Sequence, residues 1–250
     1  MLQQTQVSRV IPAWESFLDA LPTPEAAARA GQAAIVRRWE GMGYHRRAVA
    51  LHRCATQIVE RHGGVVPSSL EQLEALAGIG PYTARAVQAF AFEVDAAVVD
   101  TNVARIISRA VTGEPLRAKE TQQIADLLVP PGEAWRHNQA MLDHGALTCR
   151  PTPQCGDCTL RRSCAWARSG FASPDPARTT AGTSRPQGRF EGSDRQLRGL
   201  ILDAARKERT DPAWSAELDE RFGAERVAQQ TQVMIAEGLI VRRASGLRLA

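Results

Sequence analysis

The chain has 250 residues, 44% of them hydrophobic and 23% charged, a balance typical of a globular protein with one large or two modest cores. No apolar run is long enough to span a bilayer, and the N-terminus does not resemble a secretory signal, so a cytoplasmic protein without a membrane partner is expected. The net charge is +4, and nearly all basic residues are arginine. Arginine suits phosphate contacts, but a compositional bias explains the excess equally well.

The first 110 residues read as short amphipathic helices joined by turns. Apolar residues at helical spacing predict helices near residues 7–18, 33–39, 46–62 and 68–76. Period-two strands are absent from this region. Further helix is expected over 118–147, interrupted by a Pro-Pro-Gly turn.

A glycine-rich turn between two predicted helices is the most informative segment. Gly78-Ile79-Gly80 allows a tight turn, and Pro81 suits the first position of the next helix. The free N–H groups of that helix start can hold a phosphate, as in a helix-hairpin-helix that binds the DNA backbone. By itself, the segment is also consistent with an ordinary turn between two helices, closed by a glycine cap.

Twenty residues after Gly80, the sequence VVDTNVAR occupies residues 98–105. Asp100 precedes a predicted helix, so it is either a simple N-cap or a functional carboxylate. A hairpin followed at this distance by such an aspartate is far more specific than either feature alone. The combination resembles the helix-hairpin-helix base-excision glycosylases, in which this aspartate is catalytic.

Four cysteines form a cluster, and Cys149, Cys155, Cys158 and Cys164 fall within sixteen residues. In a cytoplasmic protein this grouping indicates metal rather than disulfides. Four thiolates can hold a [4Fe–4S] cluster or a zinc ion, and the spacing leaves both open. The upstream hairpin and aspartate favour the cluster. The fifth, Cys54, lies on an apolar helix stripe and is expected to be a buried core thiol.

The composition changes after the cysteines. Residues 169–192 are rich in Gly, Ser, Thr and Pro and are predicted to be a linker. Residues 193–250 carry two helical stripes and then two short β-like runs around a Ser-Gly turn. Helices followed by a terminal hairpin suggest a winged-helix-like module.

Three more segments complete a resemblance to the adenine DNA glycosylase family: LQQTQV at residues 2–7, WEGMGYHRRA at 39–48 and HNQAMLDHGA at 137–146. The resemblance covers residues 1 to about 168. It implies a mainly α fold, the helix-hairpin-helix glycosylase fold with a [4Fe–4S] cluster loop, plus the small C-terminal winged-helix-like module. The expected parts are a helical domain with the hairpin (1–95), a helical iron–sulfur domain (96–168), the linker (169–192) and the module (193–250).

The implied activity is base-excision repair: hydrolysis of the N-glycosidic bond of adenine mispaired with 8-oxoguanine or guanine in double-stranded DNA. By this resemblance Asp100 is catalytic, with Asn102 positioning it and Tyr82 lining the pocket. Tyr82 stands where bifunctional relatives such as endonuclease III have the lysine that forms a Schiff base, so a monofunctional enzyme is expected. The cofactor would be a [4Fe–4S] cluster on the four clustered cysteines, and the protein a monomer.

The same resemblance assigns DNA contacts. Gln4 would wedge into the base stack beside the damaged guanine, with Leu2 and Thr5 near it and Tyr44 distorting the strand. As bare residues, these are equally consistent with solvated helix positions and a loop aromatic. The other expected DNA contacts are Gly78, Gly80, Thr83 and Arg105.

The sequence departs from the family pattern in three places. The first cysteine gap is one residue short. The family's catalytic glutamate, in a segment Ser-Glu-Val just before the residue that matches Met1, is not in this sequence, so weak activity of the chain as given is expected. Many relatives end in a domain resembling a Nudix hydrolase, which this chain lacks. The alternatives are a DNA-binding iron–sulfur protein without catalysis and a glycosylase for another base.

Overall fold

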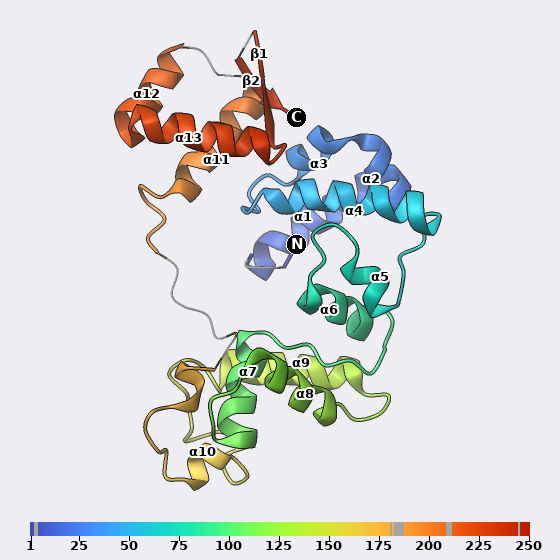
Figure 1. The fold of residues 1–250 in the computed structure, drawn as a ribbon, viewed down its shortest axis with the longest axis vertical. Helices are drawn as coiled ribbons and strands as arrows, with labels where there is room; N and C mark the ends of the chain where they lie inside the picture. Colours follow the sequence, from blue (N-terminus) through green and yellow to red (C-terminus); the bar gives the residue numbers. More distant parts are fainter. Residues whose placement is uncertain (3–4, 181, 183–187, 209–211, 245) are drawn as a thin grey trace. The chain divides into compact units, whose positions relative to one another are not determined.

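The computed structural model describes residues 1–2, 5–180, 182, 188–208, 212–244 and 246–250, apart from the side chain of residue 212. The described residues form two compact units (Figure 1). The first comprises Met1–Pro67, Leu76–Gly78 and Gln187–Ala250, and the second Ser68–Ala75 and Ile79–Pro186. Within the described ranges, no helix has the length and apolar character needed to cross a membrane.

The first unit begins with four helices: α1 (Val7–Ala20), α2 (Pro24–Ala30), α3 (Gln32–Arg38) and α4 (Arg46–His62). Local signals set their ends. The Thr23 hydroxyl accepts a hydrogen bond from the Ala26 N–H at 3.2 Å and caps α2. Gly63 ends α4 in the left-handed conformation that favours glycine. The predicted helices in this region are therefore present.

Only part of the apolar stripe predicted for α1 faces the core. Val10 and Phe17 are buried, whereas Val7, Ile11 and Trp14 are about half exposed or more. The helical spacing was predicted correctly, but spacing alone does not say which side of a two-sided apolar helix is covered. Cys54, on α4, is buried as predicted.

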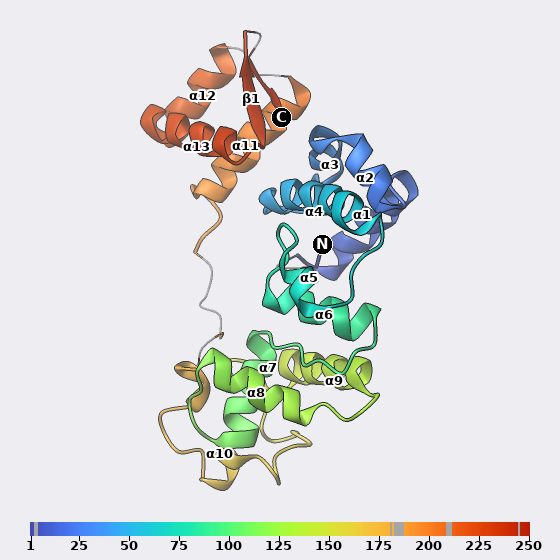
Figure 2. The same ribbon diagram turned by 45° about the vertical axis from the view of Figure 1, so that its right-hand side comes forward.

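The C-terminal module also belongs to the first unit. It consists of α11 (Asp194–Lys207), α12 (Pro212–Phe222), α13 (Ala224–Ala236), and the strands β1 (Ile240–Arg243) and β2 (Gly246–Leu249). The strands form an antiparallel hairpin in which Ile240 pairs with Leu249 and Arg242 with Leu247. Figures 1 and 2 show the three helices and the hairpin grouped together. The described part of the module thus consists of three helices followed by a hairpin, the order of elements expected for residues 193–250.

The module packs on the N-terminal helices instead of standing apart as a tethered domain. Buried residues of α3 and α11, among them Val36 and Ile201, belong to one hydrophobic core. The Arg206 guanidinium donates to the Val36 carbonyl at 3.0 Å, and Arg37 donates to the Arg206 carbonyl at 3.1 Å. The Gln32 side-chain amide also donates to the carbonyl of Gly238. The linker composition predicted a separate module, but the buried apolar residues of this module share one hydrophobic core with those of the N-terminal helices.

The second unit carries the hairpin and the cysteine loop. Its helices are α5 (Leu70–Glu74), α6 (Pro81–Ala91), α7 (Thr101–Ile106), α8 (Ala118–Leu128), α9 (Ala134–Leu147) and α10 (Ala165–Arg168). A π-helix (Ile107–Thr112) continues α7, and a 3-10 helix (Pro176–Arg178) follows α10. The helices over 118–147 were predicted. The π-helical turn was not, because periodicity does not distinguish it from α-helix over six residues.

The structure groups these elements differently from the four predicted segments. The helix α6 packs with the cysteine-bearing half, although residues 1–95 were expected to form one domain. Part of the expected linker 169–192 is also packed. Thr180 is buried, accepts a hydrogen bond from the Leu116 N–H at 3.2 Å and donates to the Pro176 carbonyl at 2.8 Å. Composition indicated a linker because the buried residues of this segment, Pro176, Ala177 and Thr180, are small or polar rather than large and apolar.

Candidate active site

The turn between α5 and α6 has the geometry of the predicted hairpin. Gly78 has φ +76°, and a Cβ there would lie 2.6 Å from the Cβ of Ala50 on α4. Both the left-handed backbone and the close approach therefore require glycine. The Ala77 N–H donates to the Gln57 side chain at 2.7 Å and fixes the turn on α4. At Gly80, an added Cβ would meet no atom within 4 Å, so sterics do not require glycine there.

Asp100 is the N-cap of α7, one of its two predicted roles. Its Oδ1 accepts hydrogen bonds from the N–H groups of Asn102 and Val103, each at 2.8 Å, and its Oδ2 accepts one from the Asn102 side-chain amide at 2.8 Å. Three donors thus fix the orientation of the carboxylate at the positive end of the helix dipole. The cap and a catalytic role are compatible, because capping holds the charge in one place.

Tyr82, in the first turn of α6, lies near this carboxylate. Burial raises the pKa of the Tyr82 phenol, and the negative charge of Asp100 raises it further. The ring is still 40% exposed. Thr83, the next residue, is partly buried. The second unit therefore brings together the three predicted catalytic residues, two by direct hydrogen bonds and the third by its electrostatic effect.

Asn138 on α9 fixes the segment that leads into Asp100. Its side chain is buried, accepts a hydrogen bond from the Val98 N–H at 2.8 Å, and donates to the carbonyls of Ala96 and Ala134, both at 2.8 Å. Sequence reasoning used this residue only as part of a matching motif. Its role is to satisfy the backbone of a buried segment that pairs with no strand among the described residues.

Gly145, also on α9, lets α9 approach α7 closely. A Cβ at this position would lie 2.6 Å from the Asn102 Cβ and 3.0 Å from its carbonyl carbon and oxygen. The contact is with the residue that donates to Asp100. The glycine of the HNQAMLDHGA motif therefore sets the position of the aspartate's main hydrogen-bond donor.

Arg105 was predicted to contact DNA, yet its side chain is buried and bound inside the protein. Its Nη2 donates to the Asn102 Oδ1 at 2.8 Å and to the Gly145 carbonyl at 2.9 Å, and its Nε donates to the Cys149 carbonyl at 2.9 Å. Its Nη1 donates to the Thr101 carbonyl at 3.1 Å. This position favours a positioning role over a phosphate contact, and it links the Asp100 site to the first cysteine of the loop.

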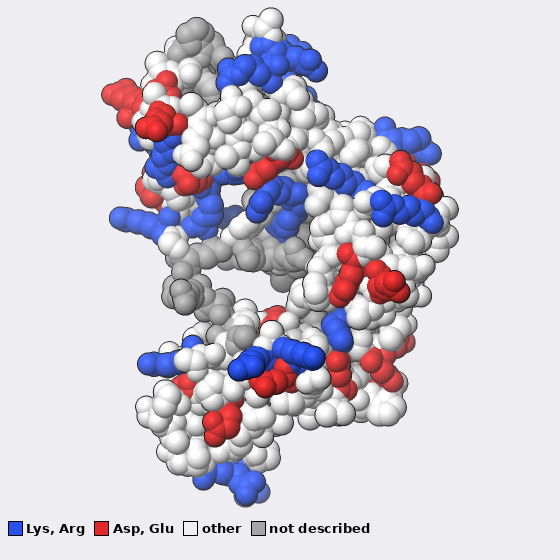
Figure 3. All heavy atoms as spheres, in the orientation of Figure 1, with Lys and Arg blue, Asp and Glu red and all other residues white. Residues whose placement is uncertain are grey.

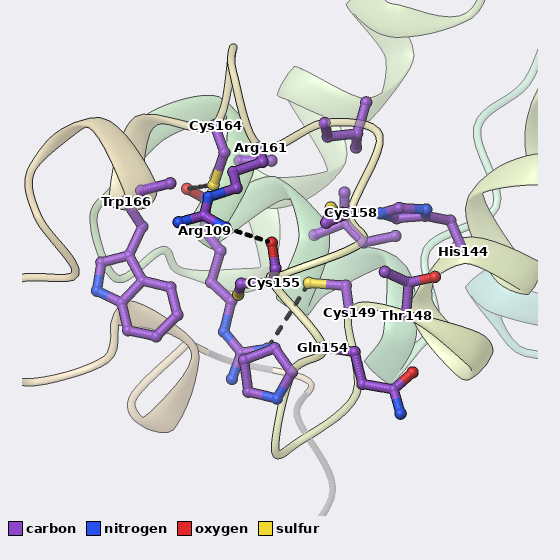
Figure 4. Close-up of a pocket in the computed structure, with 15 residues that line it drawn as sticks. Arg109, His144, Thr148, Cys149, Gln154, Cys155, Cys158, Arg161, Cys164 and Trp166 are labelled. Carbon is purple, nitrogen blue, oxygen red and sulfur yellow. Dashed lines mark hydrogen bonds between the residues drawn. The ribbon is translucent and has the colours of Figure 1, made fainter.

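The four clustered cysteines line one cavity and form no disulfide bonds (Figure 4). Arg109 of the π-helix lies against it. Its Nη1 lies 3.6 Å from the Cys149 sulfur, and its own carbonyl accepts from the Cys164 thiol at 3.4 Å. Burial raises the pKa of the Cys149 thiol, and the positive charge of Arg109 opposes that rise.

Arg109 is itself almost completely buried and held on several sides. Its guanidinium forms a bidentate ion pair with Asp175, with N–O distances of 2.9 and 2.5 Å. It also donates to the carbonyls of Arg150 and Pro151, at 2.7 and 3.1 Å, and lies over the Trp166 ring. Sequence reasoning missed this residue because an arginine in a basic protein reads as a phosphate ligand. Its neighbours Ile106 and Ile107 were the available signal of burial.

The donor set of the cavity fits an iron–sulfur cluster. Within the described ranges, no three His, Cys, Asp or Glu side chains stand close enough to form a ready group for a single ion. Four cysteine side chains nevertheless line one cavity, and four thiolates are the ligand set of a [4Fe–4S] cluster or of a zinc ion. The buried guanidinium next to Cys149 offsets part of the negative charge of such a group.

The first unit contains a second group of predicted residues, organised by Arg47. Its guanidinium donates to the Thr5 hydroxyl and the Met1 carbonyl, both at 2.9 Å, and lies over the rings of Tyr44 and Trp39. Tyr44 has a positive φ of 46° and is 40% exposed.

Two further residues, Leu2 and Gln4, were predicted for this group. Leu2 is 60% exposed. Gln4 lies outside the described residues. The organising residue, Arg47, had been noted in the sequence only as part of a matching segment.

Comparisons with known proteins agree with this fold. Residues 1–131 match the model of the HhH-GPD superfamily of base excision DNA repair proteins, so the chain belongs to this superfamily. Adenine DNA glycosylases of Mycolicibacterium smegmatis and Mycobacterium tuberculosis are 40% and 38% identical to it, over 98% of this chain and 83% and 81% of their own lengths. Within the superfamily, the chain is a member of the adenine DNA glycosylase family, which confirms the resemblance.

Three further matches bear on the parts of the chain. The human adenine DNA glycosylase is 37% identical over 66% of this chain and 31% of its own length. A thermostable thymine-DNA glycosylase structure matches with a TM-score of 0.62 and 26% identity, over 67% of this chain and 80% of that one. A trapped endonuclease III–DNA intermediate, at 23% identity and a TM-score of 0.59 over 68% and 82%, shows the same fold. The mycobacterial matches cover nearly all of this chain, including its C-terminal module.

Proposed function

We propose that this protein removes adenine mispaired with 8-oxoguanine, or with guanine, from double-stranded DNA by hydrolysing the N-glycosidic bond. The observation that carries the proposal is the fixed carboxylate of Asp100, with Tyr82 beside it, twenty residues after a helix-hairpin-helix turn. The names of the mycobacterial and human relatives support adenine as the base.

The chemistry follows from the charge that develops on the sugar. Breaking the bond leaves an oxocarbenium-like sugar, and a carboxylate beneath it stabilises that positive charge. Asp100 suits this role because three hydrogen bonds already hold it in place, so little reorganisation is needed during the reaction. The adenine must leave the duplex to be reached, and flipping is easiest for a mispaired base.

Tyr82 supports a monofunctional enzyme. A phenol cannot form an imine with the sugar, so the strand-cleaving route through a Schiff base is closed at this position. Tyr82 is proposed to line the pocket of the flipped base, which its 40% exposure and the effect of the Asp100 charge on its pKa support.

The cysteine cavity is proposed to hold a [4Fe–4S] cluster through Cys149, Cys155, Cys158 and Cys164. When bound, the cluster supplies no hydrolytic chemistry and cross-links the loop that carries its ligands. The chain's own contribution is positional. Arg105 bonds to the Cys149 carbonyl and to Asn102, so the loop and the aspartate's donor share one rigid support.

The group around Arg47 is the proposed contact with the base opposite adenine. Leu2, Gln4, Thr5 and Tyr44 are assigned to it, with Gly78, Gly80 and Thr83 contacting the phosphate backbone. The exposed Tyr44, held at a positive φ beside Arg47, suits insertion at a distorted base step. The protein is proposed to act as a monomer associated with the nucleoid in the cytoplasm.

Single-turnover release of adenine from an A:8-oxoguanine duplex tests the proposal, with the variants Asp100→Asn and Asp95→Asn. Asp95 is the control because its carboxylate also accepts a hydrogen bond from a backbone N–H, that of Gly132, but it is assigned no role in the site. Asp100→Asn should slow release about 10²-fold or more and leave duplex binding nearly intact, because the amide keeps the shape and loses the charge. Asp95→Asn should match the wild type.

The assay is run on the chain as printed and on the chain preceded by Ser-Glu-Val, because the family resemblance places a general acid in that segment. A positioned acid is worth roughly 10²–10⁴ in rate. Duplex binding without adenine release from either chain would establish the non-catalytic alternative. Release of a different base would overturn the substrate and leave the fold unaffected.

A further inference from the structure

Unpaired charges of opposite sign lie on the hairpin and on α12 of the C-terminal module. Figure 3 shows basic side chains gathered over the hairpin and acidic ones over α12. The acidic residues on α12 are Glu217, Asp219 and Glu220, none of which has an ion pair among the described residues. Because these charges are not neutralised by ion pairs, the hairpin should attract anionic partners and α12 should repel them.

The hairpin presents arginines that the fold does not use. Arg242 and Arg243 are exposed and have no acidic partner in the described part of the chain. Arg248, on the neighbouring strand, is paired with Glu208 at 3.1 Å. Neither free arginine is needed to hold the hairpin, because the buried Ile240 and Leu247 anchor it on the module.

The module holds the hairpin in a fixed position relative to the N-terminal helices. Glu237, at the end of α13, pairs with Arg198 of α11 and with Arg46 of α4. The bonds of Arg206 and Gln32 described above add to this anchoring. Because the hairpin is already fixed, its arginines lose little conformational entropy when they bind a ligand that the N-terminal helices also bind. The same arginines on a flexible tether would lose more.

We propose that the hairpin β1–β2 is a second contact of this protein with duplex DNA, in which Arg242 and Arg243 bind backbone phosphates. The inference rests on the proposed function only for its partner, double-stranded DNA. Arg242 and Arg243 are consecutive on β1, so they leave opposite faces of the hairpin and would contact separate phosphates. Two exposed cations without an acidic partner in the described part of the chain favour a polyanion. They contact phosphates and carry no base specificity, so the contact strengthens binding to matched and mismatched duplexes alike.

The test measures the affinity for an undamaged duplex by fluorescence anisotropy over a range of salt. The double variant Arg242→Ala/Arg243→Ala is compared with Arg221→Ala/Arg226→Ala, which removes the same charge from ion-paired positions on α12 and α13 of the same module. Each phosphate contact adds about 0.9 to the slope of log affinity against log salt, so the hairpin variant should lose about 1.8 from it. The ratio of wild-type affinity to that of the hairpin variant should therefore shrink about tenfold between roughly 50 and 200 mM salt.

The control variant should keep the wild-type slope, and Arg242→Lys/Arg243→Lys should restore most of the affinity because it restores the charge. Equal losses in the hairpin and control variants would mean a general charge effect and would overturn the contact. An unchanged slope in the hairpin variant overturns it as well. Wild-type protein that binds duplex but releases no adenine refutes the proposed function alone, whereas absence of duplex binding refutes both.

Discussion

Replacing Gly145 with alanine tests whether the close approach of α7 and α9 positions Asp100. The added Cβ would lie 2.6 Å from the Asn102 Cβ and 3.0 Å from two atoms of its backbone. A flexible side chain could move away, but a backbone inside a helix cannot without moving the helix. The alanine therefore has to push α7 away from α9, and Asn102 carries the amide that donates to Asp100 Oδ2.

The expected magnitude combines two opposing effects. Overpacking a core costs about 1–3 kcal/mol, and the backbone contact places this site toward the upper end. Alanine gains about 1 kcal/mol over glycine in a helix. The net loss of stability should be about 1–2 kcal/mol, which corresponds to roughly 2–8 °C in Tm for a chain of this size. The rate of adenine release should fall further, since misplacing a catalytic group by about 1 Å can cost 10²-fold.

Gly199→Ala is the matched control, because Gly199 also lies within a helix, α11, and a Cβ there meets nothing within 4 Å. This variant should gain up to about 1 kcal/mol and keep the wild-type rate. Thermal unfolding and single-turnover adenine release are measured on both. If Gly145→Ala is as stable and as active as Gly199→Ala, the helix contact does not set the position of Asp100.

Two further predictions concern buried charged groups. Burial, together with neighbouring arginines of which Arg206 has the largest effect, lowers the pKa of His45 to about 4. Between about pH 4 and 6.5 the unfolded chain therefore binds a proton that the folded chain does not. As the pH is lowered through that window, the first unit should lose up to about 3 kcal/mol of stability. Urea unfolding of His45→Gln should remove this dependence, and an unchanged pH profile would contradict it. Arg109→Met leaves the partly buried carboxylate of Asp175 without its ion-pair partner and removes a donor from Cys149, so the protein should purify with far less iron per chain, whereas wild-type iron content in this variant would refute the assignment.

Local signals in the sequence predicted the helical elements and the capping aspartate correctly. Pro81 and Gly78 set the hairpin, and Asp100 followed by a helical run was correctly identified as a helix start. These predictions depend on residues within one turn of each other. The roles of Asn138 and Gly145 could not be derived in this way, because their partners lie about 40 residues away in the chain.

Arginine was the residue type that sequence reasoning interpreted least well. Arg105 and Arg109 are both buried and bonded to backbone carbonyls or a carboxylate, whereas Arg242 and Arg243 are exposed. All four look alike in a basic chain, since a guanidinium serves equally to satisfy buried carbonyls and to bind phosphate. Only the fold separates the two uses.

The shared core of α3 and α11 also constrains the order in which the protein can fold during synthesis. Residues 68–75 and 79–186, which make up the second unit, are complete before the residues after 187 have been made. The cysteine-bearing half can therefore fold while the apolar faces of α3 and α4 still await α11. The unit that begins the chain is the last to be completed, and until then its uncovered apolar surface is what a chaperone would bind on the nascent chain.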